Sequence, residues 1–450
     1  MLTLSRRVGD AARYSGLVSG RREWAGDAPS AAHALAASGS AWCWLDGEGA
    51  APGEPRVSYL GIASEVRLAT RGGEREFLAE LRGALRGGDP AGDGFRSGWA
   101  TALGYEFGVA LLGLDPAPDS AAPGIALRLD AVLAIDHDRD LAELRGDPEA
   151  VERLATALHT PDPDPAPDPH PRPAPGPVAW RRDDREYAAE VEACRAAIRD
   201  GEAYVLCLTD TAEVDGVFDP FAIYERLRAS GAAARGGVVV AGDRALVSAS
   251  PERFLSVRGA LVATHPIKGT RPRGATPEED GALAAQLASD PKERAENLMI
   301  VDLMRNDLSR ICEPGSVAVE GFLRVESHPH VHQLVSTVVG ELRDSADVFD
   351  AIEACFPGGS MTGAPKRRAV EILAGLETGP RGLYSGCFGW IDRSGDAELA
   401  MTIRGVELRG DRARIGAGGG ITADSHAASE VAEKHLKAAS LIASLEAVPG

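Results

Sequence analysis

The spacing of apolar positions predicts helices and strands that mix along the chain without a regular alternation. Apolar side chains recur three or four positions apart over 75–86, 183–200, 220–230, 291–311, 365–376 and 425–445, which indicates helices. Short runs rich in β-branched and aromatic residues predict strands at 41–46, 56–61, 203–209, 383–392, 400–406 and 412–416, and one hairpin-like region over 238–262. Because strands and helices do not alternate strictly, the pattern favours an α+β fold over a doubly wound parallel sheet.

One segment interrupts this pattern. Residues 159–178 read HTPDPDPAPDPHPRPAPGPV, a composition too rich in Pro and Asp to pack a core, and they are interpreted as a linker or surface loop. The segment separates an N-terminal region, residues 1–158, from residues 179–450, which carry most of the candidate chemistry. The N-terminal strands are apolar enough to need a partner, so both regions are predicted to form one unit.

Composition narrows the class of protein. The chain has 450 residues and a net charge of -19, which repels nucleic acid and anionic membrane surfaces. No run of ~18 apolar residues predicts a transmembrane helix, and the first residues lack the apolar stretch of a signal peptide. The six cysteines form no C-x-x-C pair, which is typical of a reduced, cytoplasmic chain with buried thiols and without zinc.

The C-terminal helix carries a candidate site. Glu430, Glu433 and Lys437 lie at i, i+3 and i+7 and so share one helix face, which is either a solvated salt-bridge face or part of a site. The preceding Gly418, Gly419 and Gly420 are expected to form a turn between a strand and this helix, with backbone N–H groups suited to a carboxylate or phosphate. The two glutamates would then hold a divalent cation beside that anion.

Other candidates are less specific when taken alone. Residues 358–366 form a second Gly-rich turn with hydroxyl groups, but they do not match a phosphate-binding P-loop. Arg404 ends an apolar run and suits either a bound carboxylate or a neighbouring Glu. Glu296 alone is a first-turn helix charge. Lys268 lies between Ile267 and Gly269, where it is either a surface charge or a buried amine.

Taken together, these segments resemble the chorismate-utilising enzymes, a family that includes the anthranilate, aminodeoxychorismate, isochorismate and salicylate synthases. The resemblance covers residues 183–446 and rests on an ordered set of motifs: Gly201–Tyr204, Ser248–Phe254 (SASPERF), Pro266–Thr270 (PIKGT), Glu296–Arg310, His332–Gly340, Gly358–Lys366, Tyr384–Gly386, Ile403–Arg404, Gly416–Gly420 and Glu430–Lys437. It implies an α+β fold like that of anthranilate synthase component I, with two subdomains whose antiparallel sheets pack across central helices.

The resemblance also implies a role for each matching position. Glu296, Glu430 and Glu433 resemble ligands of Mg2+. The backbone of Gly418–Gly420 and Lys437 resemble the groups that grip the ring carboxylate of chorismate. Arg404 and Tyr384 resemble contacts to the enolpyruvyl carboxylate, and Ser360 and Thr270 resemble further substrate contacts. Glu252 resembles the general acid that protonates the departing C4 hydroxyl.

Lys268 distinguishes between the branches of the family. The PIKGT motif is typical of members that aminate chorismate at C4, whereas the anthranilate synthases usually have Ala in place of this Lys. The resemblance therefore implies that Lys268 forms a covalent intermediate at C2 before ammonia, delivered by a separate glutaminase subunit, adds at C4. Alternative hypotheses are amination at C2, as in anthranilate synthase component I, and a chorismate-binding subunit without activity.

Overall fold

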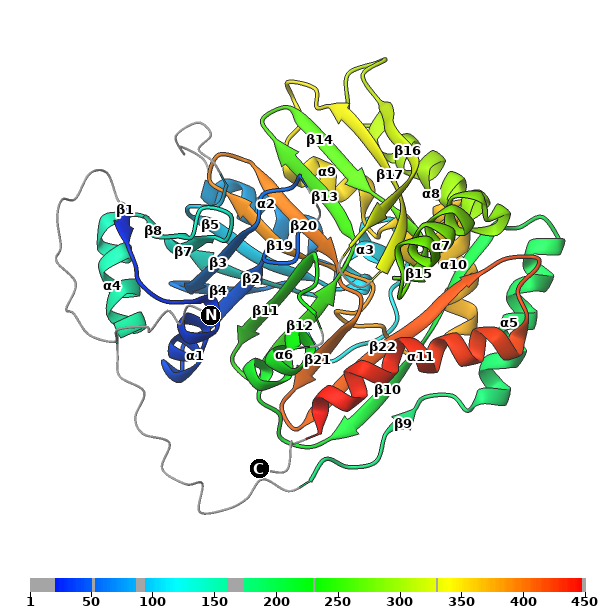
Figure 1. Cartoon of the computed structure of the whole chain (residues 1–450), viewed down its shortest axis with the longest axis horizontal. Coiled ribbons are helices and arrows are strands. Elements are labelled where there is room, and N and C mark those ends of the chain that lie inside the picture. Colours follow the sequence, from blue (N-terminus) through cyan, green and yellow to red (C-terminus); the bar gives the residue numbers. More distant parts are fainter. Residues whose placement is uncertain are drawn as a thin grey trace.

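The computed structural model describes residues 21–50, 53–85, 94–159, 174–229, 231–328 and 331–446. Within these ranges the chain forms two antiparallel sheets with helices on their outer faces (Figure 1). The α+β class and the two antiparallel sheets expected from the sequence are confirmed. Most of the predicted linker, residues 160–173, lies outside the described residues.

The first sheet contains strands from both ends of the chain. Its order is β1 (Arg21–Glu23), β8 (Leu141–Gly146), β7 (Ala131–Asp136), β3 (Val57–Ile62), β2 (Trp42–Asp46), β11 (Arg235–Ala241), β12 (Arg244–Ser250), β21 (Gly405–Arg409), β22 (Arg412–Ile421), β10 (Val205–Asp215) and β18 (Gly363–Ala364), with β9 (Ala179–Trp180) beside β10. The pairing of β2 with β11 joins the N-terminal strands to the strands that follow residue 179.

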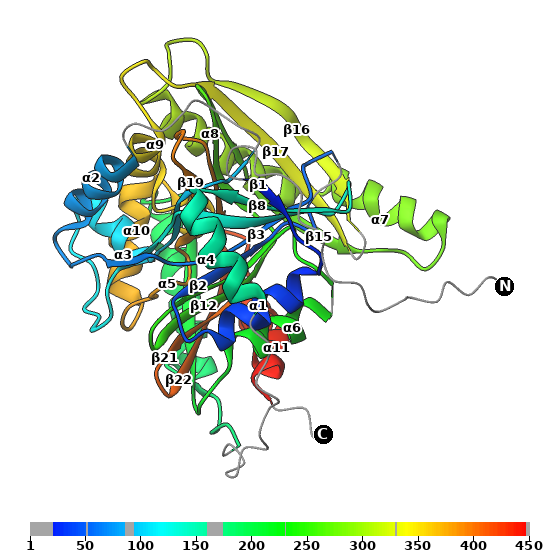
Figure 2. The ribbon, with the colours of Figure 1, turned by 90° about the vertical axis from the view of Figure 1, so that its left-hand side faces the viewer.

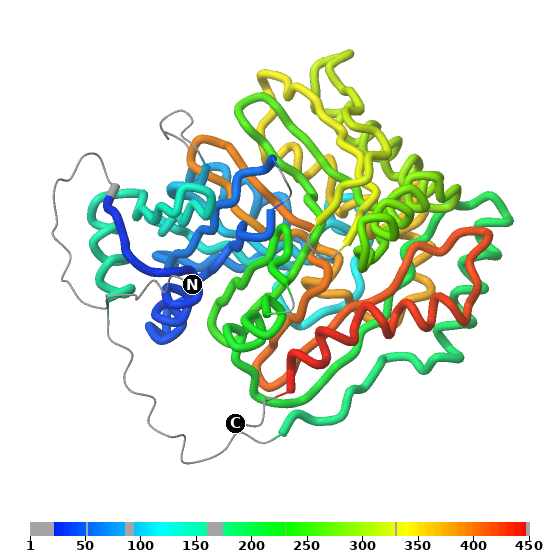
Figure 3. The backbone as a smooth tube through the Cα atoms, in the orientation of Figure 1, coloured from blue at the N-terminus to red at the C-terminus, as the bar shows by residue number. Residues whose placement is uncertain are grey.

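The second sheet likewise mixes early and late strands. Its order is β15 (Ile267–Pro272), β17 (Val331–Glu341), β14 (Leu261–His265), β13 (Arg253–Arg258), β20 (Ala397–Met401), β19 (Cys387–Asp392), β5 (Gly98–Leu103), β6 (Gly124–Leu129) and β4 (Glu65–Leu68), with β16 (Ala318–Ser327) beside β17. The chain trace shows the cyan segment that contains β5 running beside the orange segment that contains β19 (Figure 3).

The helices cover the outer faces of both sheets. They are α1 (Ala28–Ala37), α2 (Glu74–Leu85), α3 (Tyr105–Leu111), α4 (Pro148–His159), α5 (Asp184–Arg199), α6 (Pro220–Ala229), α7 (Pro277–Ser289), α8 (Pro291–Ser309), α9 (Val348–Cys355), the short 3-10 helix η1 (Gly359–Met361), α10 (Lys366–Leu376) and α11 (Ala427–Leu445). In the view of Figure 2, α7 projects at one edge of the molecule, and it contacts β15, β16 and β17.

Three apolar layers hold this arrangement together. One lies between the two sheets and includes Phe388 and Trp390. A second buries the outer face of the first sheet under α1, α4, α6 and α11, and a third buries the second sheet under α2, α8 and α9. All six cysteines are free and buried, as the sequence predicts. None of the described helices combines the length and apolar character needed to cross a bilayer.

The described chain passes between the two sheets several times, and two neighbouring crossings carry residues of the candidate site. After β12 it crosses at Pro251–Glu252 to β13, and after β20 it crosses back at 402–404 to β21. The crossings are tied to the adjacent strands, because the N–H of Met401 donates to the carbonyl of Glu252 at 3.0 Å and the N–H of Ala249 donates to that of Arg404 at 2.9 Å. Glu252 and Arg404 therefore have fixed positions at two neighbouring crossings between the sheets.

The structure corrects the sequence prediction at these crossings. The expected single hairpin over 238–262 is two hairpins, β11–β12 and β13–β14, which belong to different sheets. Pro251 has no N–H to donate to a ladder, and the strand ends before it. The strand predicted over 400–406 is likewise broken, because Arg404 adopts a φ of 51° and turns the chain.

Candidate functional site

Glu252 is a buried carboxylic acid at the first crossing. It is 7% exposed, and burial raises its pKa to about 7, although the nearby Lys268 ammonium and a hydrogen bond with the Ser360 side chain act in the opposite direction. Ser360 lies in η1 and is itself buried. A carboxyl group with this pKa is half protonated near neutral pH, which suits a general acid.

Lys268 lies at an irregularity in β15. The ladder between β15 and β17 shifts register between Ile267 and Thr270, so Lys268 and Gly269 form a bulge. Gly269 has a φ of 83°, which a residue with a Cβ rarely adopts, and α7 and α8 side chains lie within 3 Å of where its Cβ would be. Lys268 is partly buried, and its charge lowers the pKa of Glu252 and opposes the rise in that of Glu296. Lys268 therefore belongs to the same site as both carboxyl groups.

The three consecutive glycines do not form the predicted turn. Gly418, Gly419 and Gly420 lie inside β22, opposite Thr209, Leu208 and Cys207 of β10. The strand continues across them because β10 pairs with β22 as far as Ile421, whereas β21 pairs with it only as far as Ile415. From residue 416 onward one edge of β22 thus has no strand partner among the described residues.

Because Gly418–Gly420 of β22 have no side chains, the acidic groups of α11 can approach the strand there. A Cβ on Gly419 would lie 3.0 Å from the Glu430 carboxylate and 3.4 Å from that of Glu433. A Cβ on Gly420 would lie 3.9 Å from the carboxylate of Glu296, which comes from α8. The structure therefore brings the three predicted metal ligands to one segment of β22, as the last helix, red in Figure 1, runs beside that strand.

The charges of these carboxylates depend on burial, on one another and on nearby lysines. Burial, reinforced by neighbouring glutamates, raises the pKa of Glu296 and of Glu430. Burial acts in the same sense on Glu433, but the charges of Lys437, Lys292 and Lys268 together lower that pKa. The three side chains do not bring one oxygen each within 4.8 Å of the others. The donor set fits Mg2+ held by one or two carboxylates, with water and substrate completing its coordination.

Cationic and hydroxyl groups lie on the other sides of this segment. Lys437 donates to the carbonyl of Gly418 at 2.7 Å and pairs with Glu433 at 2.6 Å. Tyr384 packs over Gly416, where a Cβ would lie 2.0 Å from its ring. Burial raises the pKa of Tyr384, and the Arg404 charge opposes that rise. Burial lowers the pKa of Arg404, and the Glu433 charge opposes that fall. Thr270, by contrast, is exposed on β15, two residues after Lys268.

A buried ion pair between Arg381 and Glu377, which the sequence did not reveal, supports the segments around the site. The Arg381 guanidinium donates to Glu377, to the carbonyls of Met361 and Cys207, and to the Ser385 hydroxyl. It thereby connects η1, β10 and the segment that carries Tyr384. The i, i+4 spacing of Glu377 and Arg381 was a visible signal, but such pairs are common on helix surfaces.

Lys292 was also missed. It lies one turn before Glu296 on α8, with its Nζ atom 3.8 Å from that carboxylate, and the charges of Glu296, Glu430 and Glu433 raise its pKa despite partial burial. The chain has 48 basic residues, of which five are lysines: Lys268, Lys292, Lys366, Lys434 and Lys437. Three of these five contribute to the charge balance of the acidic cluster.

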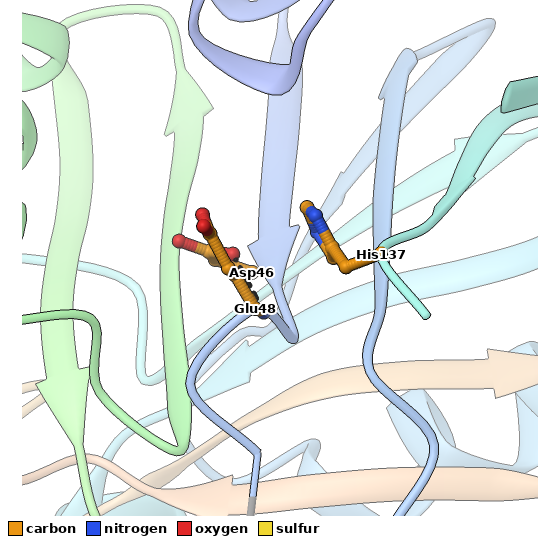
Figure 4. Close-up of side chains that lie close together, drawn as sticks. All are labelled: Asp46, Glu48 and His137. Atoms are coloured by element: carbon orange, nitrogen blue, oxygen red, sulfur yellow. Dashed lines mark hydrogen bonds between the residues drawn. The ribbon is translucent and has the colours of Figure 1, made fainter. Parts of the chain in front are cut away.

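A second group of potential metal ligands lies elsewhere. Asp46, Glu48 and His137 bring their ligand atoms within 4.8 Å of one another near the end of β2 (Figure 4). Asp46 already accepts hydrogen bonds from Tyr224 and Arg228, and the Arg228 guanidinium also pairs with Glu48. Because this guanidinium pairs with both carboxylates, we interpret the group as a structural ion-pair cluster.

The structure thus brings an acidic cluster, lysines and a buried carboxylic acid together around the glycine segment of β22 and the first crossing. The chorismate binding enzyme family matches residues 44–443, and the chain belongs to this family. It is 45% identical to an aminodeoxychorismate synthase of Streptomyces griseus over 79% of this chain and 51% of that protein. It is 37% identical to an aminodeoxychorismate synthase of Streptomyces pristinaespiralis over 93% of this chain and 64% of that protein.

The chain thus spans about half to two thirds of the length of these curated relatives. Among solved structures, anthranilate synthase component I of Streptococcus pneumoniae superposes with a TM-score of 0.73 at 26% identity, covering 96% of this chain and 94% of that one. This chain therefore shares its fold with a protein that is named for another product, anthranilate.

Proposed function

We propose that this protein aminates chorismate at C4 with ammonia and releases 4-amino-4-deoxychorismate and water. The observation that carries the proposal is the placement of Lys268 in one site with Glu252, a buried acid whose pKa is about 7. The identity to two aminodeoxychorismate synthases supports the same reaction.

The first step joins Lys268 to the ring. Its neutral amine attacks C2, both ring double bonds move by one position, and the C4 hydroxyl leaves as water with the proton of Glu252. A Lys must lose its proton before it can attack, and its ordinary pKa of ~10.4 makes the neutral form rare at pH 7.

The second step reverses the shift of the double bonds. Ammonia attacks C4, the double bonds return, and the bond between C2 and the lysine nitrogen breaks to release the neutral amine. The new C4 ammonium group returns one proton to the Glu252 carboxylate. Glu252 is then protonated again, so the two steps leave the enzyme unchanged and consume one ammonia for each water released.

The remaining site residues bind and orient the substrate. Lys437 and the free edge of β22 at Gly418–Gly420 would grip the ring carboxylate. Arg404 and Tyr384 would hold the enolpyruvyl carboxylate, with Ser360 and Thr270 as further contacts. Glu296, Glu430 and Glu433 would hold Mg2+, which as a Lewis acid stabilises the charge that develops on the ring carboxylate.

We further propose that a glutaminase on a separate chain supplies the ammonia and that the reaction occurs in the cytoplasm. Six free, buried cysteines support a reducing compartment. Glutamine should then support turnover only when such a glutaminase is added, whereas ammonium salts should support it without one.

The decisive test is the product made from chorismate, ammonium and Mg2+, identified by mass and fluorescence. Wild-type protein should give 4-amino-4-deoxychorismate, and Lys268→Ala should not. Unchanged product formation by Lys268→Ala would remove this residue from the mechanism. Anthranilate from the wild-type protein would establish amination at C2 instead, and tight binding of chorismate without turnover would indicate an inactive subunit.

A further inference from the structure

Arg253 and His265 form a side-chain pair at the base of the two segments that carry Glu252 and Lys268. Arg253 directly follows Glu252, and His265 precedes Lys268 by three positions. The two residues are backbone partners in the β13–β14 ladder. Nη1 of Arg253 also donates to Nε2 of His265 at 2.7 Å. One contact thus connects the start of β13 to the end of β14.

The backbone ladder is irregular at this point. The β13–β14 pairing shifts register between Arg253 and Ser256, and the β13–β20 pairing shifts between Arg253 and Leu255. Pro266 then separates β14 from β15, and β15 contains the bulge at Lys268. Because hydrogen bonds of a regular ladder do not fix the spacing here, side chains must do so.

Arg253 is held from a second strand. Its Nε atom donates to the carboxylate of Glu398 on β20 at 2.6 Å, and Nη2 lies 2.9 Å from Glu54. Burial would raise the pKa of Glu398, but the guanidinium groups of Arg253, Arg235 and Arg258 lower it to about 2. The carboxylate therefore stays charged at all working pH values and anchors Arg253.

His265 is held as a neutral acceptor. Burial and the neighbouring charges of Arg253 and Arg235 lower its pKa to about 3. Because Nε2 accepts from Arg253, Nδ1 carries the proton and donates to the Thr337 hydroxyl of β17 at 3.3 Å. Since β17 is also the ladder partner of β15, the imidazole bridges the strand after Glu252 and the strand beside Lys268.

We propose that His265, held by Arg253 and Glu398, is a positioning residue that sets the separation of the Glu252 carboxyl from the Lys268 amine. The proposal rests on the proposed function, because it assigns these two groups to the same reaction. The imidazole touches no reacting atom and acts only through the strands that it joins.

Two substitutions at one position separate positioning from general packing. His265→Gln keeps an acceptor at a reach similar to that of Nε2, and His265→Leu removes it. We expect kcat of His265→Leu to fall roughly ten- to hundredfold, as for a misplacement of about 1 Å, with KM for chorismate within about threefold of wild type. His265→Gln should restore kcat to within about threefold of wild type at a similar thermal midpoint.

The reactivity of Lys268 gives a readout that needs no knowledge of the product. The chain has only five lysines, so acetic anhydride labelling, followed peptide by peptide, reports the rate at Lys268 relative to Lys292, whose side chain is 53% exposed. His265→Leu should change the relative rate at Lys268 at least twofold, and His265→Gln should not. If wild type fails to make 4-amino-4-deoxychorismate, the proposed function fails, while this labelling comparison still tests the positioning.

The results that overturn the proposal are equally defined. They are wild-type kcat and Lys268 labelling in His265→Leu, or a His265→Gln variant as impaired as His265→Leu. Should His265→Leu not fold, Thr337→Val removes the second contact of the imidazole and takes its place. A smaller fall in kcat with unchanged KM would then support the proposal, and unchanged kcat would refute it.

Discussion

Lys437 and Glu433 form an ion pair in which Nζ lies 2.6 Å from Oε1, although they are proposed to bind different partners. Lys437 is assigned to the ring carboxylate of chorismate and Glu433 to Mg2+. In the structure each group neutralises the other. Binding of metal and substrate must therefore exchange this pair for two new ones, which couples the two binding events electrostatically.

Removal of Lys437 should consequently affect metal and substrate in opposite directions. Both side chains are partly exposed, at 32% and 44%, so the pair contributes at most about 1 kcal/mol. Lys437→Gln should strengthen Mn2+ binding in the absence of substrate by up to about fivefold, measured by electron paramagnetic resonance. The same variant should raise KM for chorismate. Arg412→Gln, at the other end of β22, is the control, and weaker Mn2+ binding in Lys437→Gln would contradict the argument.

The raised pKa of Glu252 predicts how activity depends on pH. A general acid must be protonated, so kcat should decline as pH rises through about 7. Glu252→Gln cannot donate this proton, and its residual rate should lack this limb of the pH profile. Glu190 on α5 is the control, because burial also raises its pKa to about 7. If Glu190→Gln loses the decline of kcat with pH, or Glu252→Gln keeps it, the titrating group is not Glu252.

The same pKa predicts a cost in stability. The folded state holds the Glu252 proton up to about pH 7, whereas the unfolded chain releases it near the ordinary glutamate pKa of 4.5. Stability from this group is therefore complete below about pH 4.5 and is lost as pH rises to about 7, on the order of 3 kcal/mol. Glu252→Gln should raise the thermal midpoint at pH 8 and leave it nearly unchanged at pH 4.5. Equal effects at both pH values would exclude the linkage.

Sequence patterns were sufficient to predict a helix where that helix buries one face. The helices at 183–200, 220–230 and 291–311 were predicted within two residues of α5, α6 and α8. The order of motifs indicated the family, and the acidic residues of α8 and α11 were assigned to one site before the structure placed them around β22. Local spacing identifies such faces because helical periodicity repeats within a single element.

The sequence failed where a residue's role depends on contacts from distant segments. Gly418–Gly420 resembled a turn, because nothing local indicates that β10 pairs with them or that Glu430 needs the space of an absent Cβ. Arg404 lay in an apolar run that predicted a continuous strand, but the chain crosses between sheets there. His265 gave no signal, since its partners Arg253 and Thr337 lie 12 and 72 positions away.

Gly416 tests the link between an absent side chain and substrate binding. A Cβ at this position would lie 2.0 Å from the Tyr384 ring, so Gly416→Ala must displace the tyrosine. We expect KM for chorismate to rise about tenfold, because Tyr384 is assigned to the enolpyruvyl carboxylate and a charge-assisted hydrogen bond contributes roughly 1.5–3 kcal/mol. Gly83→Ala in α2, where nothing lies within 4 Å of the added Cβ, should keep wild-type kinetics. If Gly416→Ala keeps the wild-type KM, Tyr384 does not contact the substrate.

The buried ion pair of Lys366 and Asp307 predicts a strong and asymmetric effect on stability. The two side chains are 8% and 4% exposed, their charged atoms lie 2.6 Å apart, and Lys366 also donates to the carbonyl of Cys355. Lys366→Met leaves the Asp307 carboxylate buried beside only the half-exposed Arg310, and it should reduce the free energy of unfolding by about 3–5 kcal/mol in urea titrations. The double variant Lys366→Met/Asp307→Leu removes both charges and should recover most of this loss. A single variant that costs less than about 1 kcal/mol, or a double variant no better than the single one, would mean that the pair does not hold α8 against α10.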